Sequence, residues 1–302
     1  MAATTLQDLL DGDLPIIADG GMGTMLFSLG LENGEAPELW NVEQPDRIRR
    51  VHRQYIEAGA QIILTNTFGG NRIRLKFHDI EGRAFELNQA AAQLARKEAD
   101  AADHPVVVAG SMGPSGSILE PYGDLSSDEA SAVFKEQAAA LIDGGVDVLW
   151  IETMSALEEV RAAVAGIRAA AADFPIVATM TFDVNGHTMM GVSPEKALEE
   201  VSSLGVLALG GNCGNGPAEI ETVITKMHAV NPKVTLVAKS NAGVPQLIDD
   251  VPVYDASPED MGHYAARARD LGATIIGSCC GSTPDHIRAI RESLQSGQKN
   301  HA

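Results

Sequence analysis

The sequence has 302 residues, 45% hydrophobic and 21% charged, with a formal net charge of −19, a composition typical of an ordinary globular protein. The negative charge argues against nucleic acid and anionic membranes as partners, and no apolar stretch approaches the roughly 20 residues of a membrane-spanning helix. Three cysteines argue against a disulfide framework, and the acidic start lacks a signal-peptide pattern, so we expect a cytoplasmic protein.

Eight short apolar runs recur along the chain, and a polar or glycine-rich turn follows each of them. The runs are nearly continuous in apolar residues, as expected of strands that are buried on both faces of a parallel sheet. We predict strands at residues 15–21, 61–68, 105–111, 146–153, 175–182, 205–213, 233–241 and 273–280.

Helical patterns separate these runs. Three of the later ones open with Ser-Pro or Thr-Pro, where the hydroxyl can cap the first turn and proline is tolerated. We predict helices within residues 46–59, 83–102, 128–145, 155–171, 193–205, 216–230, 257–272 and 283–297.

Eight strand–helix units in about 280 residues favour an α/β fold, a (β/α)₈ TIM barrel. An open doubly wound sheet is the alternative, but "DGGMGTM" after the first strand lacks the G-x-G-x-x-G spacing of that class. No linker or low-complexity segment divides the sequence. We therefore expect residues 1–302 to form a single domain, with a core at about 15–292.

Polar residues stand where several of the predicted strands end, which is where functional groups gather in such a barrel. Asp19 and Glu152 end apolar runs at positions where a hydrophobic residue would be the default. All three cysteines, Cys213, Cys279 and Cys280, end the sixth and eighth runs. A lone buried cysteine is usually just a small hydrophobic residue, but three at strand ends favour a shared role.

Three cysteine sulfurs that converge on one rim indicate a zinc site with an open fourth position. Three thiolates around Zn²⁺ give a net charge of about −1, which makes the metal a weak activator of water. A substrate thiol is the better fit, because zinc holds it as a thiolate at neutral pH. Asp19 and Glu152 can receive the ammonium of an amino-acid thiol, and backbone N–H groups of Gly20 and Gly21 can receive its carboxylate.

The residues of this rim belong to longer motifs, namely "DGGMGT" (19–24), "LTNTFGGNR" (64–72), "ET" (152–153), "GGNCGNGP" (210–217), "KSNAGVPQ" (239–246) and "GSCCGSTPDHIRAI" (277–290). In these motifs the sequence resembles the homocysteine S-methyltransferase family. The family includes the homocysteine-binding module of cobalamin-dependent methionine synthase, betaine–homocysteine methyltransferase and enzymes that use S-methylmethionine.

The resemblance implies a zinc-dependent barrel that methylates homocysteine to methionine. It implies zinc ligands at Cys213, Cys279 and Cys280, and contacts of Asp19 and Glu152 with the homocysteine ammonium. Three further positions follow from it as substrate-binding residues: Thr65, Thr67 and Asn241. In methionine synthase-like members an asparagine at the position of Asn241 can fill the fourth zinc position without substrate. The two threonines also favour strands, so a packing role is an alternative for them.

The resemblance leaves the methyl donor open. Gly69 and Thr153 stand where betaine enzymes carry tyrosines, whereas the 64–72 and 239–246 motifs look most like methionine synthase. The sequence ends where the folate and cobalamin modules of that enzyme would begin. We therefore expect either betaine or another small donor (S-methylmethionine or dimethylsulfoniopropionate among them), or a methylated corrinoid on a separate protein. The alternatives are a homocysteine-activating subunit of a corrinoid-dependent synthase with no donor site of its own, or an enzyme for another thiol such as selenohomocysteine. A homo-oligomer is compatible with the sequence.

Overall fold

The computed structural model describes residues 4–12, 14–183, 185–248 and 251–296. Eight parallel strands form one sheet in the order β1-β10-β7-β6-β5-β4-β3-β2. A bridge between Ala18 and Ile62 joins the two edges, and Asp19 N donates to Ile62 O at 2.9 Å. The predicted TIM barrel is therefore confirmed. The strands are β1 Ile16–Ile17, β2 Ile62–Leu64, β3 Val107–Met112, β4 Val148–Met154, β5 Ile176–Met180, β6 Ala208–Cys213, β7 Leu236–Ser240 and β10 Ala273–Ser278.

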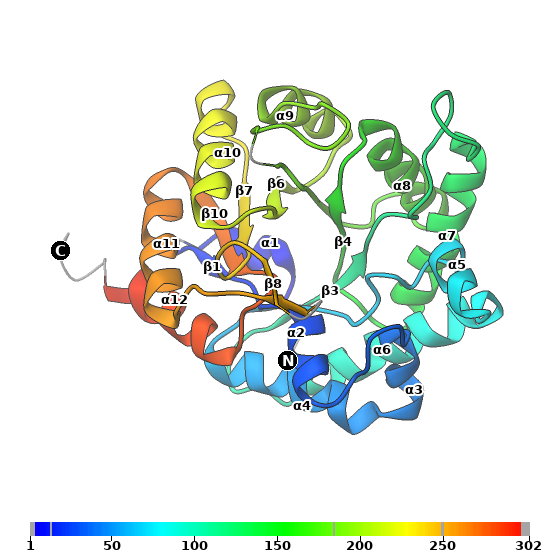
Figure 1. Ribbon diagram of the computed structural model, residues 1–302, viewed down its shortest axis with the longest axis horizontal. Coiled ribbons are helices and arrows are strands. Elements are labelled where there is room, and N and C mark those ends of the chain that lie inside the picture. The colour runs from blue at the N-terminus through cyan, green and yellow to red at the C-terminus, as the bar shows by residue number, and fades with distance from the viewer. Residues whose placement is uncertain (1–3, 13, 184, 249–250, 297–302) are drawn as a thin grey trace.

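Helices alternate with the strands and surround the barrel (Figure 1). The longer ones are α4 Pro45–Ala58, α6 Ala84–Asp100, α7 Ser127–Asp143, α8 Leu157–Ala170, α9 Pro194–Ser202, α10 Pro217–Val230, α11 Pro258–Asp270 and α12 Pro284–Ser296. Each predicted strand and helix matches one of these elements. The Ser193 and Ser257 side chains accept backbone N–H groups in the first turns of α9 and α11, as the Ser-Pro pattern predicts. Among the described residues, no helix is both long and apolar enough to cross a membrane.

The short helix α1 (Leu6–Leu10) lies against one end of the barrel interior. Its Leu6 is 1% exposed and packs in the same cluster as Val107, Val148 and Ile275, whose side chains fill the barrel. Apolar side chains therefore occupy this end, and the polar strand ends lie at the other. Helix α1 was not predicted from the sequence, because five residues are too few for a clear helical period.

Three further short helices and a hairpin belong to the connections. The helices are α2 Met22–Ser28, α3 Trp40–Glu43 and α5 Arg72–Leu75. The hairpin consists of β8 (Gln246–Ile248) and β9 (Val251–Val253), which pair antiparallel in the connection after β7. Tyr254 follows the hairpin, and its ring packs directly against Gly281. This contact joins the β7 connection to the loop that carries Cys279 and Cys280. The hairpin was not predicted from the sequence.

Candidate metal and substrate site

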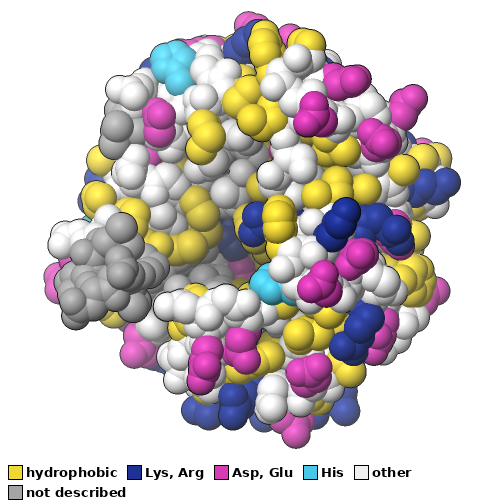
Figure 2. Space-filling model, turned by 45° about the vertical axis from the view of Figure 1, so that its right-hand side comes forward, with side chains coloured by type: hydrophobic (Ala, Val, Ile, Leu, Met, Phe, Trp, Pro, Cys, Tyr) yellow, Lys and Arg dark blue, Asp and Glu magenta, His cyan; other side chains and the backbone are white. Residues whose placement is uncertain are grey.

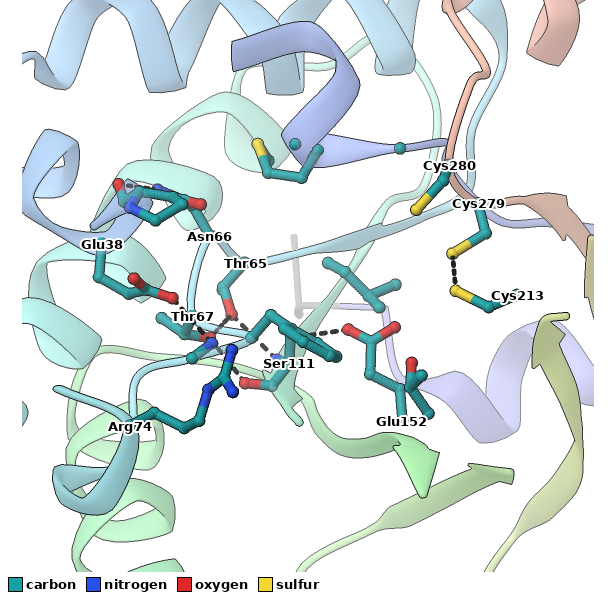
Figure 3. A pocket seen from close by; sticks show the side chains of 18 of the residues that line it. Glu38, Thr65, Asn66, Thr67, Arg74, Ser111, Glu152, Cys213, Cys279 and Cys280 are labelled. Atoms are coloured by element: carbon teal, nitrogen blue, oxygen red, sulfur yellow. Dashed lines mark hydrogen bonds between the residues drawn. The ribbon is translucent and has the colours of Figure 1, made fainter. Parts of the chain in front are cut away.

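The structure brings the three cysteines together at one end of the barrel. Cys213 ends β6, and Cys279 and Cys280 follow β10. Their Sγ atoms all lie within 4.8 Å of one another, and the thiols are free (Figure 3). Such spacing suits three ligands of one metal ion.

Left-handed backbone shapes the strand ends that face this cluster. Cys213 has φ 60° and Thr153, which follows Glu152 in β4, has φ 61°. Non-glycine residues seldom adopt this conformation, and where they do the surrounding structure must hold them in it. The turn at Cys213 ends the alternation of side chains along β6, and its Sγ lies 2.8 Å from Cys279 Sγ. Gly281 has φ 82°, so its backbone too lies in the left-handed region, next to the Cys279–Cys280 pair.

Asp19 lies just below the cysteines with both carboxylate oxygens engaged. Its Oδ2 accepts from Leu64 N at 2.7 Å, and its Oδ1 accepts from Lys239 Nζ at 2.7 Å. Asp19 is 1% exposed and Lys239 is 3% exposed. Burial raises the pKa of Asp19, and the Lys239 ammonium opposes that rise. Lys239 is not among the site residues predicted from the sequence, although a lysine inside the apolar run 233–241 is itself unusual.

Glu152 lies between the cysteines and the two threonines that follow β2, Thr65 and Thr67 (Figure 3). The Ser111 hydroxyl donates to its Oε1, and no hydrogen bond to Oε2 is found within the described part of the chain. Burial raises the pKa of Glu152 to about 7, while the Lys239 ammonium acts in the opposite direction. Glu152 is therefore about half ionised near neutral pH, and its Oε2 is free for a cationic group.

Thr65 and Thr67 line the same space but also build it. Their hydroxyls are 2.6 Å apart; Thr65 Oγ1 accepts from Ser111 N at 3.0 Å, and Thr67 Oγ1 donates to Ser111 O at 2.7 Å. These bonds tie the end of β2 to the end of β3 (Figure 3). Thr65 and Thr67 therefore have a structural role, which was the alternative to substrate contact for these two residues.

Gly20 and Gly21 allow the loop after β1 to approach the loop after β10. A Cβ on Gly20 would lie 2.5 Å from Ser282 Oγ, and one on Gly21 would lie 2.7 Å from Cys279 O. Gly21 N already donates to Ser282 Oγ at 3.0 Å. Asn241 joins two cysteine loops, because its Nδ2 donates to Gly214 O at 2.7 Å and its Oδ1 accepts from Cys280 N at 3.1 Å. Its side chain therefore supports the cysteines rather than pointing freely at them.

A cavity of about 520 Å³ extends from the cysteines toward the loop after β2. Figure 2 shows a hollow in this face of the molecule, with hydrophobic side chains around it. One end holds sulfur, Glu152 and Lys239. The other end holds aromatic and charged side chains that the sequence analysis did not identify, namely Glu38, Phe68, Arg74, Phe77 and His78.

Glu38 is the buried carboxylate of that second end. It is 5% exposed, and its Oε1 accepts from Gly69 N at 2.7 Å. Burial raises its pKa. Figure 3 shows Glu38 and Arg74 on one side of the view and the cysteines on the other, with Glu152 between. The cavity therefore has two chemically different ends. Glu38 was hard to find from the sequence because it lies in the connection after α2, away from every strand end.

The homocysteine S-methyltransferase family matches residues 16–294. The methionine synthase of Mycobacterium leprae (strain TN) is 33% identical over 297 residues, which cover 92% of this chain and 24% of that protein. The methionine synthase of Mycobacterium tuberculosis (strain ATCC 25618 / H37Rv) is 34% identical over 309 residues, covering 96% and 25%. The chain thus spans about a quarter of the length of these relatives.

Solved structures agree with this assignment. The metallated form of the homocysteine methyltransferase MmuM from Escherichia coli is 25% identical with a TM-score of 0.79, covering 95% of this chain and 99% of that one. A methyltransferase from Methanosarcina mazei shares the fold alone, at 13% identity and a TM-score of 0.62, over 97% of this chain and 99% of that one. The match to the family extends over nearly all the elements that build the cavity, and the chain belongs to the homocysteine S-methyltransferase family.

Proposed function

We propose that this chain is a zinc-dependent methyltransferase that transfers a methyl group to the thiol of homocysteine and so forms methionine. The observation that carries the proposal is the convergence of three free cysteine sulfurs within 4.8 Å at the end of a cavity. Free thiols persist in reducing compartments, so we place the protein in the cytoplasm.

The cysteine cluster fits zinc by its chemistry as well as by its spacing. Hydrogen bonds from Cys213 and Cys279 lower the pKa of Cys280, whereas hydrogen bonds to the other two thiols raise the pKa of Cys213. The cluster therefore forms one thiolate readily and needs a cation to form three. Zinc held by Cys213, Cys279 and Cys280 would keep a substrate thiol as a thiolate in its fourth position.

The carboxylates of the site suit the amino-acid part of homocysteine. The free Oε2 of Glu152 can accept hydrogen bonds from the substrate ammonium. Asp19 adds negative charge beneath the same position, although both its oxygens already have partners. Gly20 and Gly21 let substrate approach the backbone closely, and Thr65 and Thr67 complete the wall. Because both reactants are held in one cavity, much of the rate would come from proximity and orientation.

The transfer itself needs no general base on the methyl group. A new sulfur–carbon bond forms as the bond between the methyl carbon and the donor breaks, and the donor leaves with that electron pair. No proton leaves the methyl carbon. The task of this chain's residues is thus to align the thiolate with the methyl group and to exclude water.

The second end of the cavity favours betaine or a related small donor. Phe68 and Phe77 can contact a methylated cation through their rings, and Glu38 adds a buried carboxylate nearby. Arg74 supplies a cation for a donor carboxylate. These groups together suit a zwitterion that carries a methylated onium group and a carboxylate.

A second candidate is a homocysteine-activating subunit of a corrinoid-dependent methionine synthase. What favours it is the similarity of this chain to the two methionine synthases. In that case a methylated corrinoid on a separate protein would dock over the cavity, and the chain would have no donor site of its own.

One experiment separates the two candidates. The zinc-loaded protein is incubated with homocysteine and, in turn, betaine, S-methylmethionine, dimethylsulfoniopropionate, free methylcobalamin and a methylated corrinoid protein, and methionine is measured by mass spectrometry. Cys213→Ser serves as the inactive control. We expect turnover with one of the first three donors. Methionine only upon addition of a methylated corrinoid protein would support the subunit, and none under any condition would contradict both.

A further inference from the structure

A lysine is buried at the floor of the cavity, where the family resemblance assigned no residue. Lys239 belongs to β7 and lines the cavity, yet is 3% exposed. Its ion pair with Asp19 explains how the ammonium can be buried, since an unpaired buried charge is strongly destabilising. The pair does not explain why the charge is there, because apolar residues of similar volume would serve the barrel as well.

The ammonium of Lys239 has binding capacity left. It carries three N–H donors, and Asp19 Oδ1 is the one hydrogen-bond acceptor found for it within the described residues. The ring of Trp150 lies to another side, with its centroid 5.6 Å from Nζ. Lys239 and Glu152 both line the cavity, so an unused donor can serve a ligand there.

Charges of opposite sign therefore lie at this end of the cavity: Lys239 and Glu152 line it, and the buried Asp19, which does not line it, pairs with Lys239. An amino acid presents its ammonium and its carboxylate on one carbon. An ammonium on Glu152 leaves the adjacent carboxylate to find a cation. Without Lys239 that carboxylate would lie beside Glu152 and the cysteine sulfurs with only backbone N–H groups of the loop after β1 to bind, and the N–H of Gly21 is already bonded to Ser282.

The other cation that could compete lies elsewhere. Arg74 lines the cavity, but Figure 3 places it beside Glu38 at the far end from the cysteines. A thiol bound at the cysteines has its amino-acid group nearer to Glu152. Lys239 is thus the cation on the side of the cavity where that group would lie.

We propose that Lys239 determines specificity for an α-amino acid by binding the carboxylate of the thiol substrate, while Glu152 binds its ammonium. This inference rests on the proposed function, since it assumes that the thiol end binds at the cysteines. It assigns to the zwitterion two neighbouring side chains of opposite charge, and it gives Asp19 a positioning role through Lys239.

The test uses three thiols and measures binding to the zinc-loaded full chain by calorimetry. Homocysteine has both charged groups, γ-mercaptobutyrate lacks the amino group, and γ-aminopropanethiol lacks the carboxylate. Each is titrated into the unaltered protein, Lys239→Met, and the control Lys233→Met, whose lysine is exposed just before the same strand. Zinc content and circular dichroism verify that each variant is loaded and folded.

We expect Lys239→Met to weaken homocysteine and γ-mercaptobutyrate by a similar factor, about tenfold or more, as for a lost charged hydrogen bond. Binding of γ-aminopropanethiol should not weaken. Lys233→Met should change none of the three. If Lys239→Met does not fold, Lys239→Gln gives the same comparison, because its amide can still donate to Asp19.

Three outcomes would overturn the inference. Equal weakening of all three thiols would indicate a general structural effect, and weakening of only the two amines would mean that Lys239 acts through Asp19 alone. No change with any thiol would remove Lys239 from recognition. A failure of the unaltered zinc-loaded protein to bind homocysteine would instead overturn the proposed function itself, and is seen before any variant is made.

Discussion

Asn212 holds Thr153 by two hydrogen bonds across the strand ends. Its Oδ1 accepts from Thr153 N at 2.8 Å, and its Nδ2 donates to Thr153 Oγ1 at 2.7 Å. Thr153 has left-handed backbone, and so does Cys213, the neighbour of Asn212. One amide therefore supports two unfavourable backbone conformations, one after Glu152 and one at a cysteine of the cluster.

Asn212→Ala should lower the free energy of unfolding by about 1–3 kcal/mol, because a buried N–H loses its partner. It should also weaken metal binding, since Cys213 would no longer be held in place. Thr153→Ala removes only the hydroxyl contact and should have the smaller effect. Urea unfolding and competition with a chelator measure the two quantities. Equal losses in both variants would show that the backbone contact contributes nothing.

Cys213→Ser should abolish both stoichiometric zinc and activity, since a serine hydroxyl is a poor zinc ligand at neutral pH. Metal analysis of the purified protein measures this. Asp19→Asn is the matched control within the site; it should keep its zinc and raise the KM for homocysteine. Full zinc occupancy in Cys213→Ser would make the proposed ligand set wrong.

The affinity for homocysteine should depend on the ionisation of Glu152. The raised pKa of about 7 means that the carboxylate is charged above that pH and protonated below it. Pairing with the substrate ammonium should therefore be present above pH 7 and be lost as the pH falls, by up to about tenfold per unit. Ionisation of the homocysteine thiol adds its own pH dependence, so the same measurement is made on Glu152→Gln. Below pH 7 the logarithm of the affinity of this variant should change with pH by one proton less than that of the unaltered protein. Identical slopes would contradict the assignment.

Arg74→Met should raise the KM for a donor that carries a carboxylate and leave the KM for homocysteine unchanged, since the two ends of the cavity are separate. Steady-state kinetics with the preferred donor measure this. Lys76→Met, an exposed cation from the same part of the chain that does not line the cavity, should change neither constant. A raised KM for homocysteine alone would contradict this assignment, because it would mean that Arg74 acts at the cysteine end of the cavity.

Leu6→Ala should lower the free energy of unfolding by about 2–3 kcal/mol, because the side chain is buried against the barrel interior and its loss leaves a cavity. Leu14, which is 53% exposed, is the matched control, and Leu14→Ala should change stability by less than about 0.5 kcal/mol. Urea unfolding measures the free energy, provided that its dependence on urea concentration (the m-value) is the same in all variants. Equal effects would show that α1 does not stabilise the barrel.

The sequence predicted those features that depend on local pattern. The strand periods, the helix starts at Ser193 and Ser257, and the position of Cys213 at a strand end all follow from neighbouring residues. The role of Lys239 does not follow from neighbouring residues. Whether a strand residue points into the barrel depends on the register of its strand with the adjacent strands. A buried lysine is also tolerated only because it pairs with Asp19, 220 positions away in the sequence. Glu38 is similar: its importance arises from Gly69 N, which a connection outside the barrel strands brings near.

The order of strands in the barrel has a consequence for biosynthesis. β10 lies between β1 and β7, so the first strand made stays without one of its neighbours until the last has left the ribosome. The same strand leads into Cys279 and Cys280, which complete the cluster with Cys213. Closure of the barrel and assembly of the thiol cluster are thus one event, which awaits the synthesis of β10. A nascent chain that is truncated before β10 would expose a lone Cys213 and could not retain a metal ion through it.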